Sequence, residues 1–156
     1  MRYSIIPVTP LQQNCSLLWC EETAEAAIVD PGGDLERILA EVAVQGVTPV
    51  KILLTHTHID HVGGTGELSQ RLDLPIEGPH RDDRPWLDAL DRQSDMFGFP
   101  RVLHFTPDRW LEHGDRVDIG AQRLEVIHCP GHTPGHVVFF HPRERLVLVG
   151  DVLFKG

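Results

Sequence analysis

Cysteine is scarce in this sequence of 156 residues, and the three cysteines that it has, Cys15, Cys20 and Cys129, follow no regular spacing. They are too few for a disulfide framework, and no Cys-x-x-Cys pair indicates a zinc or redox site. The sequence therefore favours a reducing cytosol. We expect Cys15 and Cys20 to act as small apolar residues in or beside a buried strand.

Basic residues are also in short supply. The sequence has 14 lysines and arginines against 23 aspartates and glutamates, which gives a formal net charge of −9. This balance argues against the broad cationic surface that binds nucleic acid or anionic lipid, so we expect neither partner.

Long apolar runs are absent as well. No stretch of the sequence approaches the roughly 20 apolar residues needed to span a bilayer. The first seven residues lack the apolar centre and the small-residue cleavage site of a signal peptide. We therefore expect a cytoplasmic protein without a membrane partner, and the sequence leaves its oligomeric state open.

The rest of the composition is that of an ordinary globular protein, with a hydrophobic fraction of 41%. A chain of this length can bury its own core, and it shows neither an internal repeat nor a low-complexity segment. We predict a single domain over residues 1–156.

Short β-branched runs alternate with helical patterns along the chain. Three strands come first, at residues 5–8, 16–19 and 26–29, and predict an antiparallel meander. Asp34 is placed to cap a helix that stops at Gly46. Further strands are expected at residues 50–54, 74–76, 116–119, 122–128, 137–140 and 145–149. A helix is expected after Gly64 and through Leu72, and a helix and loop over residues 80–99.

The segment at residues 80–99 is rich in aspartate. Five of these side chains are spread around the expected helix, which predicts a solvated face rather than a metal site; they are Asp82, Asp83, Asp88, Asp91 and Asp95. We expect Met96, Phe97 and Phe99 to pack against the protein. The alternative is that they line the mouth of a substrate site.

Four side chains that can bind metal occupy six residues where the strand at residues 50–54 ends. They are His56, His58, Asp60 and His61. In an extended chain alternate side chains lie on one side, so His56 and His58 can share one ion. Asp60 and His61 are adjacent and precede Gly63-Gly64, so a turn there can direct this pair to a second ion. A histidine-rich surface loop is the alternative, and it accounts poorly for this density.

Two later strand ends carry further candidates. His132 lies in the loop at residues 129–136, where two prolines and two glycines constrain the backbone. His128 and Cys129 compete with it as ligands, because a thiolate binds zinc well, and we expect His136 to have a supporting or structural role. Asp151 follows the last strand, where it is either a bridge between two cations or an ordinary turn residue.

The His-x-His-x-Asp-His motif at residues 56–61 resembles the signature of the metallo-beta-lactamase superfamily. The resemblance implies an α+β protein, a metallo-β-lactamase-like four-layer αββα sandwich, with a one- or two-metal site. Asp30 resembles the aspartate that supports the histidine loop in that superfamily, although it could simply form a turn. The resemblance assigns the first metal to His56, His58, His132 and Asp151, and the second to Asp60, His61 and Asp151. Two zinc ions are expected, with iron or manganese as alternatives.

A finer resemblance is to the short bacterial glyoxalase II-like proteins, the hydroxyacylglutathione hydrolases. It rests on the stretches at residues 29–33, 60–64, 129–136 and 150–156. It implies hydrolysis of a small-molecule thioester such as S-D-lactoylglutathione by a metal-bound hydroxide, with Asp60 as the catalytic residue that orients the water. A thiol with a pKa of about 8.5 leaves as a thiolate with little help from a general acid.

Three other functions remain open. A persulfide dioxygenase shares this scaffold but uses one iron, and His56, His132 and Asp151 match its ligands. A nuclease of the same superfamily is disfavoured by the acidic balance. A truncated, non-enzymatic metal-binding or interaction module would follow if the 156 residues are the complete natural protein.

Members of the glyoxalase II-like family continue past the position that matches Gly156. Their later segment carries one more histidine for the second metal. We therefore expect this chain to be incomplete at its C-terminus, and the natural sequence to supply another metal-binding histidine beyond Gly156.

Overall fold

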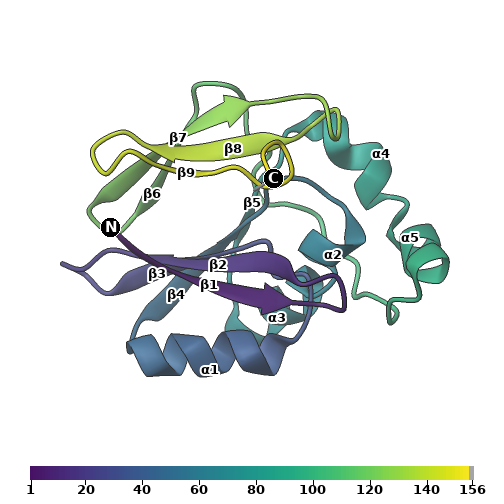
Figure 1. Ribbon diagram of the computed structural model, residues 1–156, viewed down its shortest axis with the longest axis horizontal. Coiled ribbons are helices and arrows are strands. Elements are labelled where there is room, and N and C mark those ends of the chain that lie inside the picture. Colours follow the sequence, from purple (N-terminus) through teal and green to yellow (C-terminus); the bar gives the residue numbers. More distant parts are fainter. Residues whose placement is uncertain (155–156) are drawn as a thin grey trace.

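The computed structural model describes residues 1–154 and consists of two β-sheets that face each other, with helices outside the first sheet and at one end of both (Figure 1). Lys155 and Gly156 lie outside the described residues. They are the last two residues of the stretch at 150–156 that resembles the glyoxalase II-like proteins. The expectation about the sequence beyond Gly156 also falls outside them.

The first sheet has five strands in the order β1-β2-β3-β4-β5. Its first three strands form the predicted antiparallel meander; they are β1 (Arg2–Val8), β2 (Gln13–Trp19) and β3 (Glu25–Val29). Helix α1 (Leu35–Gln45) then carries the chain back, so that β4 (Thr48–Leu53) lies parallel to β3. After β4 come α2 (Ile59–Val62), α3 (Thr65–Leu72) and β5 (Ile76–Glu77), which is parallel to β4.

Two predicted features of the first sheet need correction. Strand β5 begins later than predicted because the backbone amide of Leu74 still bonds to the carbonyl of Ser69 and closes the end of α3. Asp34 holds the N-cap position of α1, but its side chain does not cap the helix. Instead its Oδ2 accepts a hydrogen bond from the amide of Thr9 at 2.8 Å, which ties the β1–β2 turn to the start of α1.

The second sheet has four antiparallel strands in chain order; they are β6 (Arg116–Ile119), β7 (Gln122–His128), β8 (Val137–His141) and β9 (Leu146–Leu148). The predicted hairpin of β6 and β7 is confirmed. Strand β9 is shorter than predicted. Arg145, at φ 52°, belongs to the turn before it, and the carbonyl of Val149 already accepts the amide of Val152 in the turn after it.

Apolar residues are buried on both faces of the first sheet. Ala26 and Ile28 of β3 lie in a cluster with Ile38 of α1. Ala27 and Val29, which alternate with them, lie in a second cluster between the two sheets. Successive strand residues point to opposite faces, so one strand contributes to both cores.

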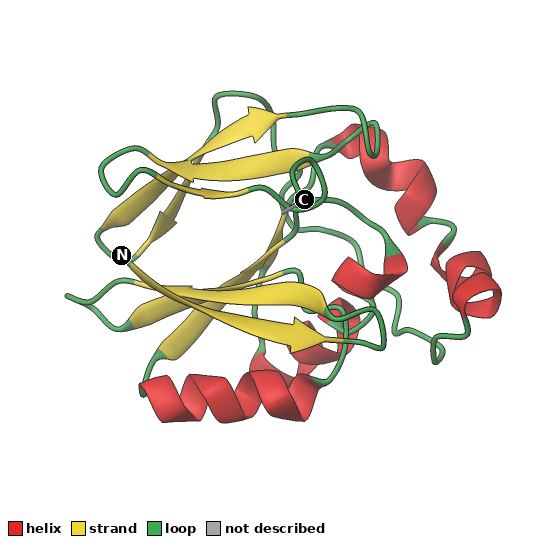
Figure 2. Cartoon of the chain, in the orientation of Figure 1, coloured by secondary structure: helices red, strands yellow, loops and turns green. Residues whose placement is uncertain are grey.

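The α+β class and the helix, sheet and sheet layers of the predicted sandwich are confirmed (Figure 2). The outer face of the second sheet carries exposed charged side chains such as Arg123 and Glu125. In residues 1–154 no helix covers this face, so the fourth layer is not in the described part of the chain.

The chain between β5 and β6 forms a short 3-10 helix η1 (Arg81–Asp83) and the helices α4 (Arg84–Leu87) and α5 (Leu90–Phe97). They lie beside α2 at the end of the sandwich (Figure 1). Within residues 1–154, none of the helices has the length and apolar character needed to cross a bilayer.

Candidate metal centre

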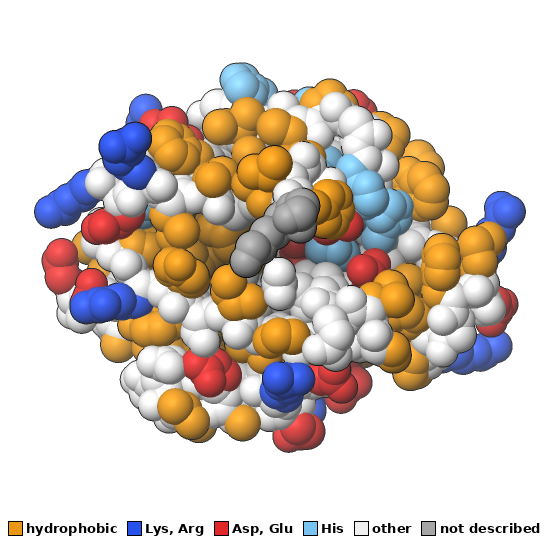
Figure 3. Space-filling view, in the orientation of Figure 1, with side chains coloured by type: hydrophobic (Ala, Val, Ile, Leu, Met, Phe, Trp, Pro, Cys, Tyr) orange, Lys and Arg blue, Asp and Glu red, His pale blue; other side chains and the backbone are white. Residues whose placement is uncertain are grey.

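The candidate ligands follow three strands that end on the same side of the molecule. His56 and His58 come after β4, His132 comes after β7, and Asp151 comes after β9. Figure 3 shows histidine side chains gathered in a hollow of the surface, with acidic side chains beside them. Residues from distant parts of the sequence therefore meet at one centre.

Three histidines form the first cluster. His56, His58 and His132 each offer one ring nitrogen, and these atoms lie within 4.8 Å of one another. His132 Nε2 lies 2.9 Å from His58 Nδ1. His56 Nδ1 lies 3.0 Å from Thr55 Oγ1, whereas its buried Nε2 has no hydrogen-bond partner among the described residues.

This cluster fits a metal ion. A buried nitrogen without a partner is costly, and an ion at the centre of the three imidazoles would satisfy it. Burial, reinforced by the neighbouring histidines, lowers the pKa of His56 far below its usual range. Its ring is therefore neutral, as metal binding requires.

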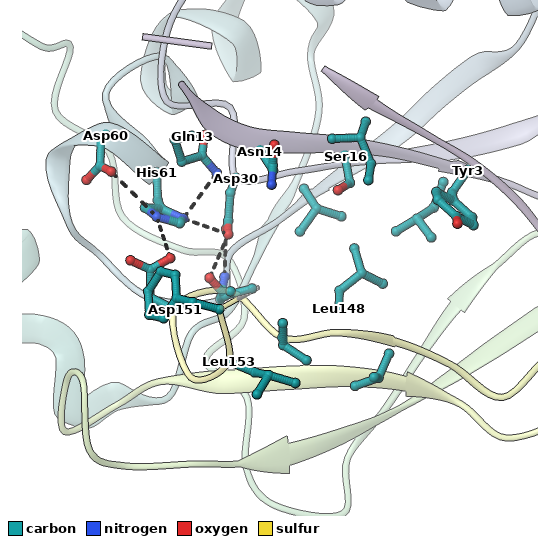
Figure 4. A pocket seen from close by; sticks show the side chains of 18 of the residues that line it. Tyr3, Gln13, Asn14, Ser16, Asp30, Asp60, His61, Leu148, Asp151 and Leu153 are labelled. Atoms are coloured by element: carbon teal, nitrogen blue, oxygen red, sulfur yellow. Dashed lines mark hydrogen bonds and ion pairs between the residues drawn. The ribbon is translucent and has the colours of Figure 1, made fainter. Parts of the chain in front are cut away.

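His61 and two aspartates form the second cluster (Figure 4). His61 Nε2 lies 3.1 Å from Asp151 Oδ1 and 3.7 Å from Asp60 Oδ2. The other oxygen of Asp151 lies 3.4 Å from His132 Nε2, so one carboxylate faces both clusters. This is the position that a bridging ligand needs.

The electrostatic field at His61 favours a cation. Burial opposes protonation of His61, but its hydrogen bonds with Asp151 and Asp30 outweigh that effect and raise its pKa to about 10. The surrounding carboxylates that stabilise a proton on the ring also stabilise a divalent ion beside it.

Asp30 supports both clusters. Its Oδ1 accepts the backbone amide of Thr55 at 2.8 Å, and its Oδ2 accepts the Thr55 hydroxyl at 2.6 Å. The same Oδ2 lies 3.0 Å from His61 Nδ1. The backbone of Asp30 has the left-handed conformation, at φ 52°. Through Thr55 and His61 it fixes the orientation of rings in the two clusters.

His136 has the supporting position expected for it. Its buried ring stacks on His56 with centroids 4.7 Å apart, and its Nε2 accepts the backbone amide of Asp151 at 3.1 Å. Gly150, the residue before Asp151, has a φ of 51°, and a Cβ on it would lie 2.6 Å from His136 Nε2. Only glycine lets the Asp151 loop approach this closely.

Asp83 contradicts the prediction of a solvated face. The other four aspartates of residues 80–99 are exposed, but Asp83 is fully buried. Its Oδ2 accepts the backbone amide of Thr57 at 2.8 Å, and its Oδ1 accepts that of Gly135 at 2.6 Å. The sequence gives no local sign of this role, because Asp83 stands in a run of similar residues.

Gln93 is a second support that the sequence does not reveal. It is buried, and its Oε1 accepts the backbone amide of Ile59 at 3.0 Å. Its Nε2 donates to the carbonyls of Thr57 at 3.2 Å and Trp86 at 2.9 Å. Helix α5 thus fixes the backbone on both sides of His58.

The two competitors of His132 lie outside these clusters. Cys129 belongs to none of the metal-competent groups in the described chain. His128 belongs to a third group with His80 and Asp82, but its ring stacks on that of His80 at 4.1 Å and 16°. Lone pairs of two nearly parallel rings lie in separate planes and do not converge on an ion about 2 Å from each nitrogen.

Comparisons with known proteins agree with the fold and the site. The sequence profile of the Metallo-beta-lactamase superfamily matches residues 8–156. Hydroxyacylglutathione hydrolase GloC of Haemophilus influenzae is 41% identical over 157 residues, an alignment that covers 100% of this chain and 74% of that protein.

Two solved structures are also similar. BLEG-1 B3 metallo-beta-lactamase has a TM-score of 0.87 and 35% identity, with 99% of this chain and 74% of that chain covered. TTHA1623 in a di-iron-bound form has a TM-score of 0.86 and 38% identity, with 98% and 74% covered. Histidine and aspartate clusters in this fold imply a divalent metal. The chain belongs to the metallo-beta-lactamase superfamily, as a glyoxalase II-like enzyme.

Proposed function

We propose that this metal-dependent hydrolase cleaves a small-molecule thioester at a centre of two ions. In this proposal the first ion is held by His56, His58, His132 and Asp151, and the second by Asp60, His61 and Asp151. The observation that carries it is the position of Asp151, whose two oxygens lie 3.4 Å from His132 Nε2 and 3.1 Å from His61 Nε2.

Zinc is the ion that we propose, with iron or manganese as alternatives. Imidazole nitrogens and carboxylate oxygens bind all three metals. The similar protein TTHA1623 was crystallised in a di-iron-bound form, which supports a centre of two ions without deciding which metal this chain takes.

The residues of the centre suit hydrolysis without a covalent intermediate on the protein. The metal-competent groups of residues 1–154 contain histidine and aspartate but no cysteine. When bound, a divalent ion lowers the pKa of water and polarises a carbonyl, which supplies nucleophile and electrophile at neutral pH. The part-exposed carboxylate of Asp60 lies next to His61 and orients the attacking water by accepting a hydrogen bond from it.

A thioester fits the lack of an obvious general acid. A thiol leaves as a thiolate because its pKa of about 8.5 is close to neutral, whereas an amine or alcohol must first receive a proton. The similarity to hydroxyacylglutathione hydrolase GloC supports the same class of substrate, and S-D-lactoylglutathione is the first compound to test.

A cavity beside the centre is large enough for a small molecule. It has a volume of about 520 Å³ and lies between β1 and β2 on one side and β9 with the Asp151 loop on the other (Figure 4). Asp60, His61 and Asp151 lie at its end, and Gln13, Asn14 and Ser16 add polar groups to its wall. Polar groups in such a wall fix the orientation of a ligand.

The test compares two reactions on one preparation. Protein loaded with zinc, iron(II) or manganese(II) is incubated with S-D-lactoylglutathione or S-hexanoylglutathione and assayed for thiol release, and with glutathione persulfide and assayed for oxygen uptake. We expect thiol release without oxygen uptake. Oxygen uptake alone would assign the protein to the persulfide dioxygenases. The absence of oxygen uptake, and of thiol release from both S-D-lactoylglutathione and S-hexanoylglutathione, in a metal-loaded sample would favour a non-enzymatic metal-binding module.

A further inference from the structure

A second cavity, of about 420 Å³, lies next to the same centre and shares Leu11 and Asp60 with the first. Helices α4 and α5, the start of α2 and the tip of the β1–β2 turn surround it. His58 and Asp60 belong to its wall, so it begins at the candidate metal ligands. We call it the α5 cavity.

Large apolar side chains face this cavity from the surface. Leu11, Trp86, Met96 and Phe97 line it, and their exposed fractions are 61%, 40%, 64% and 59%. Single exposed apolar residues are common, but four that converge on one hollow indicate a binding site. Figure 3 shows apolar side chains next to the histidine hollow.

The exposure of Met96 and Phe97 has two different causes. Helix α5 is held by Leu90, Gln93 and Ser94, which are buried, and the helical period turns Met96 away from that face. Phe97 follows Ser94 by three residues and shares that face, but it is the last residue of α5 and remains exposed beside the cavity. The prediction that these two side chains pack against the protein is therefore wrong. Their position matches the alternative, the mouth of a substrate site.

One cation lies in the wall of the α5 cavity. Arg92 is exposed and lines the cavity, and within residues 1–154 it forms no ion pair with a carboxylate. A guanidinium next to an apolar wall can bind a carboxylate with two parallel hydrogen bonds. The cavity thus combines apolar walls with one site for a negative charge.

We infer that the α5 cavity binds the acyl group of the substrate, and that this group is an apolar chain or ring, favoured further when it ends in a carboxylate that reaches Arg92. The inference rests on the proposed function, because it places the thioester carbonyl between the two cavities. The wall of the 520 Å³ cavity is mixed: apolar side chains such as Leu148 stand beside Gln13 and Asn14, whose polar groups can bind a polar thiol such as glutathione. The wall of the α5 cavity is more apolar, which leaves it for the acyl group. A lactoyl group, small and polar, fills this space poorly.

Four thioesters of glutathione, with acetyl, lactoyl, hexanoyl and adipoyl groups, test this assignment on the metal-loaded protein. Hexanoyl and adipoyl thioesters should exceed the acetyl thioester in kcat/KM by roughly tenfold or more, since each added methylene in an apolar pocket gives a substantial preference. The adipoyl thioester has the length of the hexanoyl one and adds the carboxylate. It should be the best substrate of the four.

Variants of the wall of the α5 cavity test which residues cause the preference among acyl groups. The double variant Met96→Ser with Phe97→Ser should lower the ratio of kcat/KM for hexanoyl over acetyl, and Arg92→Met should bring adipoyl down to hexanoyl. Val44→Ser and Arg37→Met change exposed residues of α1 that line neither cavity, and they serve as matched controls. Equal kcat/KM for acetyl and hexanoyl in the unaltered protein would overturn the inference.

A binding measurement separates this inference from the proposed function. S-hexylglutathione and S-methylglutathione are thioethers that cannot be hydrolysed, and calorimetry gives their Kd for the metal-loaded protein. We expect the hexyl compound to bind about tenfold more tightly, and the double variant to lose the difference. If this holds but no thioester is cleaved, the proposed function fails and the site stands. If thioesters are cleaved but both compounds bind equally, the site fails and the function stands.

Discussion

The carboxylate of Asp83 accepts a hydrogen bond from the backbone amide of Gly135 at 2.6 Å, across 52 residues of sequence. Its other oxygen accepts the amide of Thr57, which stands between His56 and His58. One buried side chain therefore joins the loop of these two histidines to the loop that carries His132. The distance between the candidate ligands of the first cluster depends on a residue that is in neither loop.

Replacing Asp83 should weaken both the fold and metal binding. In Asp83→Asn one carboxylate oxygen is replaced by an NH2 group, which cannot accept the hydrogen bond of the backbone N–H that faces it. The free energy of unfolding should therefore fall by about 1–3 kcal/mol. The affinity for zinc should fall as well, because the two loops lose their common anchor. Denaturant unfolding and a zinc titration measure these effects. Asp82→Asn, at an exposed neighbour, is the control, and equal behaviour of the two variants would exclude the anchoring role.

Histidines of the first cluster should differ in their effect on metal content from His80 and His113, which belong to neither of the two clusters at the centre. His58→Ala and His132→Ala should each lose most of the metal at the first site, because three imidazoles define it. His80→Ala and His113→Ala should keep their metal. Elemental analysis of the purified variants decides this. Full metal content in both cluster variants would refute the ligand assignment.

Asp60 should matter more for turnover than for folding. Asp60→Asn keeps the size of the side chain but removes its charge, so kcat for thioester hydrolysis should fall by about 100-fold or more. The thermal unfolding midpoint should change little, because the side chain is partly exposed. The comparison requires matched metal content. Unchanged hydrolysis under that condition would rule out its role in orienting the water.

Removal of the metal should destabilise the protein. A chelator leaves His56 Nε2 buried without a partner among the described residues, and it removes the contacts of the ion with the ring nitrogens of the first cluster. An ion present at about 100 times its Kd contributes about 2.7 kcal/mol to stability, so Tm should fall on chelation and recover when zinc is restored. The His58→Ala variant should show a smaller fall. A Tm that is the same with and without chelator in the unaltered protein would contradict this.

The sequence was sufficient for features that depend on local patterns. The density of histidine and aspartate at residues 56–61, at the end of a β-branched run, predicted a metal site there. Asp151 was added to this prediction only by the resemblance to the metallo-beta-lactamase superfamily, and the structure shows it beside His61 and His132. The meander of β1, β2 and β3 followed from strand and turn patterns in the same way.

Features that depend on distant contacts could not be predicted. Asp83 and Gln93 receive their roles from backbone amides far away in the sequence, and nothing near them distinguishes them from exposed neighbours. Asp34 was expected to cap a helix, but the amide of Thr9 competes successfully for its carboxylate. Met96 and Phe97 have the composition of core residues, and only the position of α5 in the fold shows that they are exposed.

A zinc titration of the metal-free protein tests the central claim most directly, with bound zinc and thiol release from a glutathione thioester measured in each sample. The account predicts that thiol release rises with zinc occupancy and is lost in His58→Ala and in Asp60→Asn. Iron(II) and manganese(II) are titrated in the same way. Ions bound in stoichiometric amounts, without thiol release for any of the three metals, would contradict it.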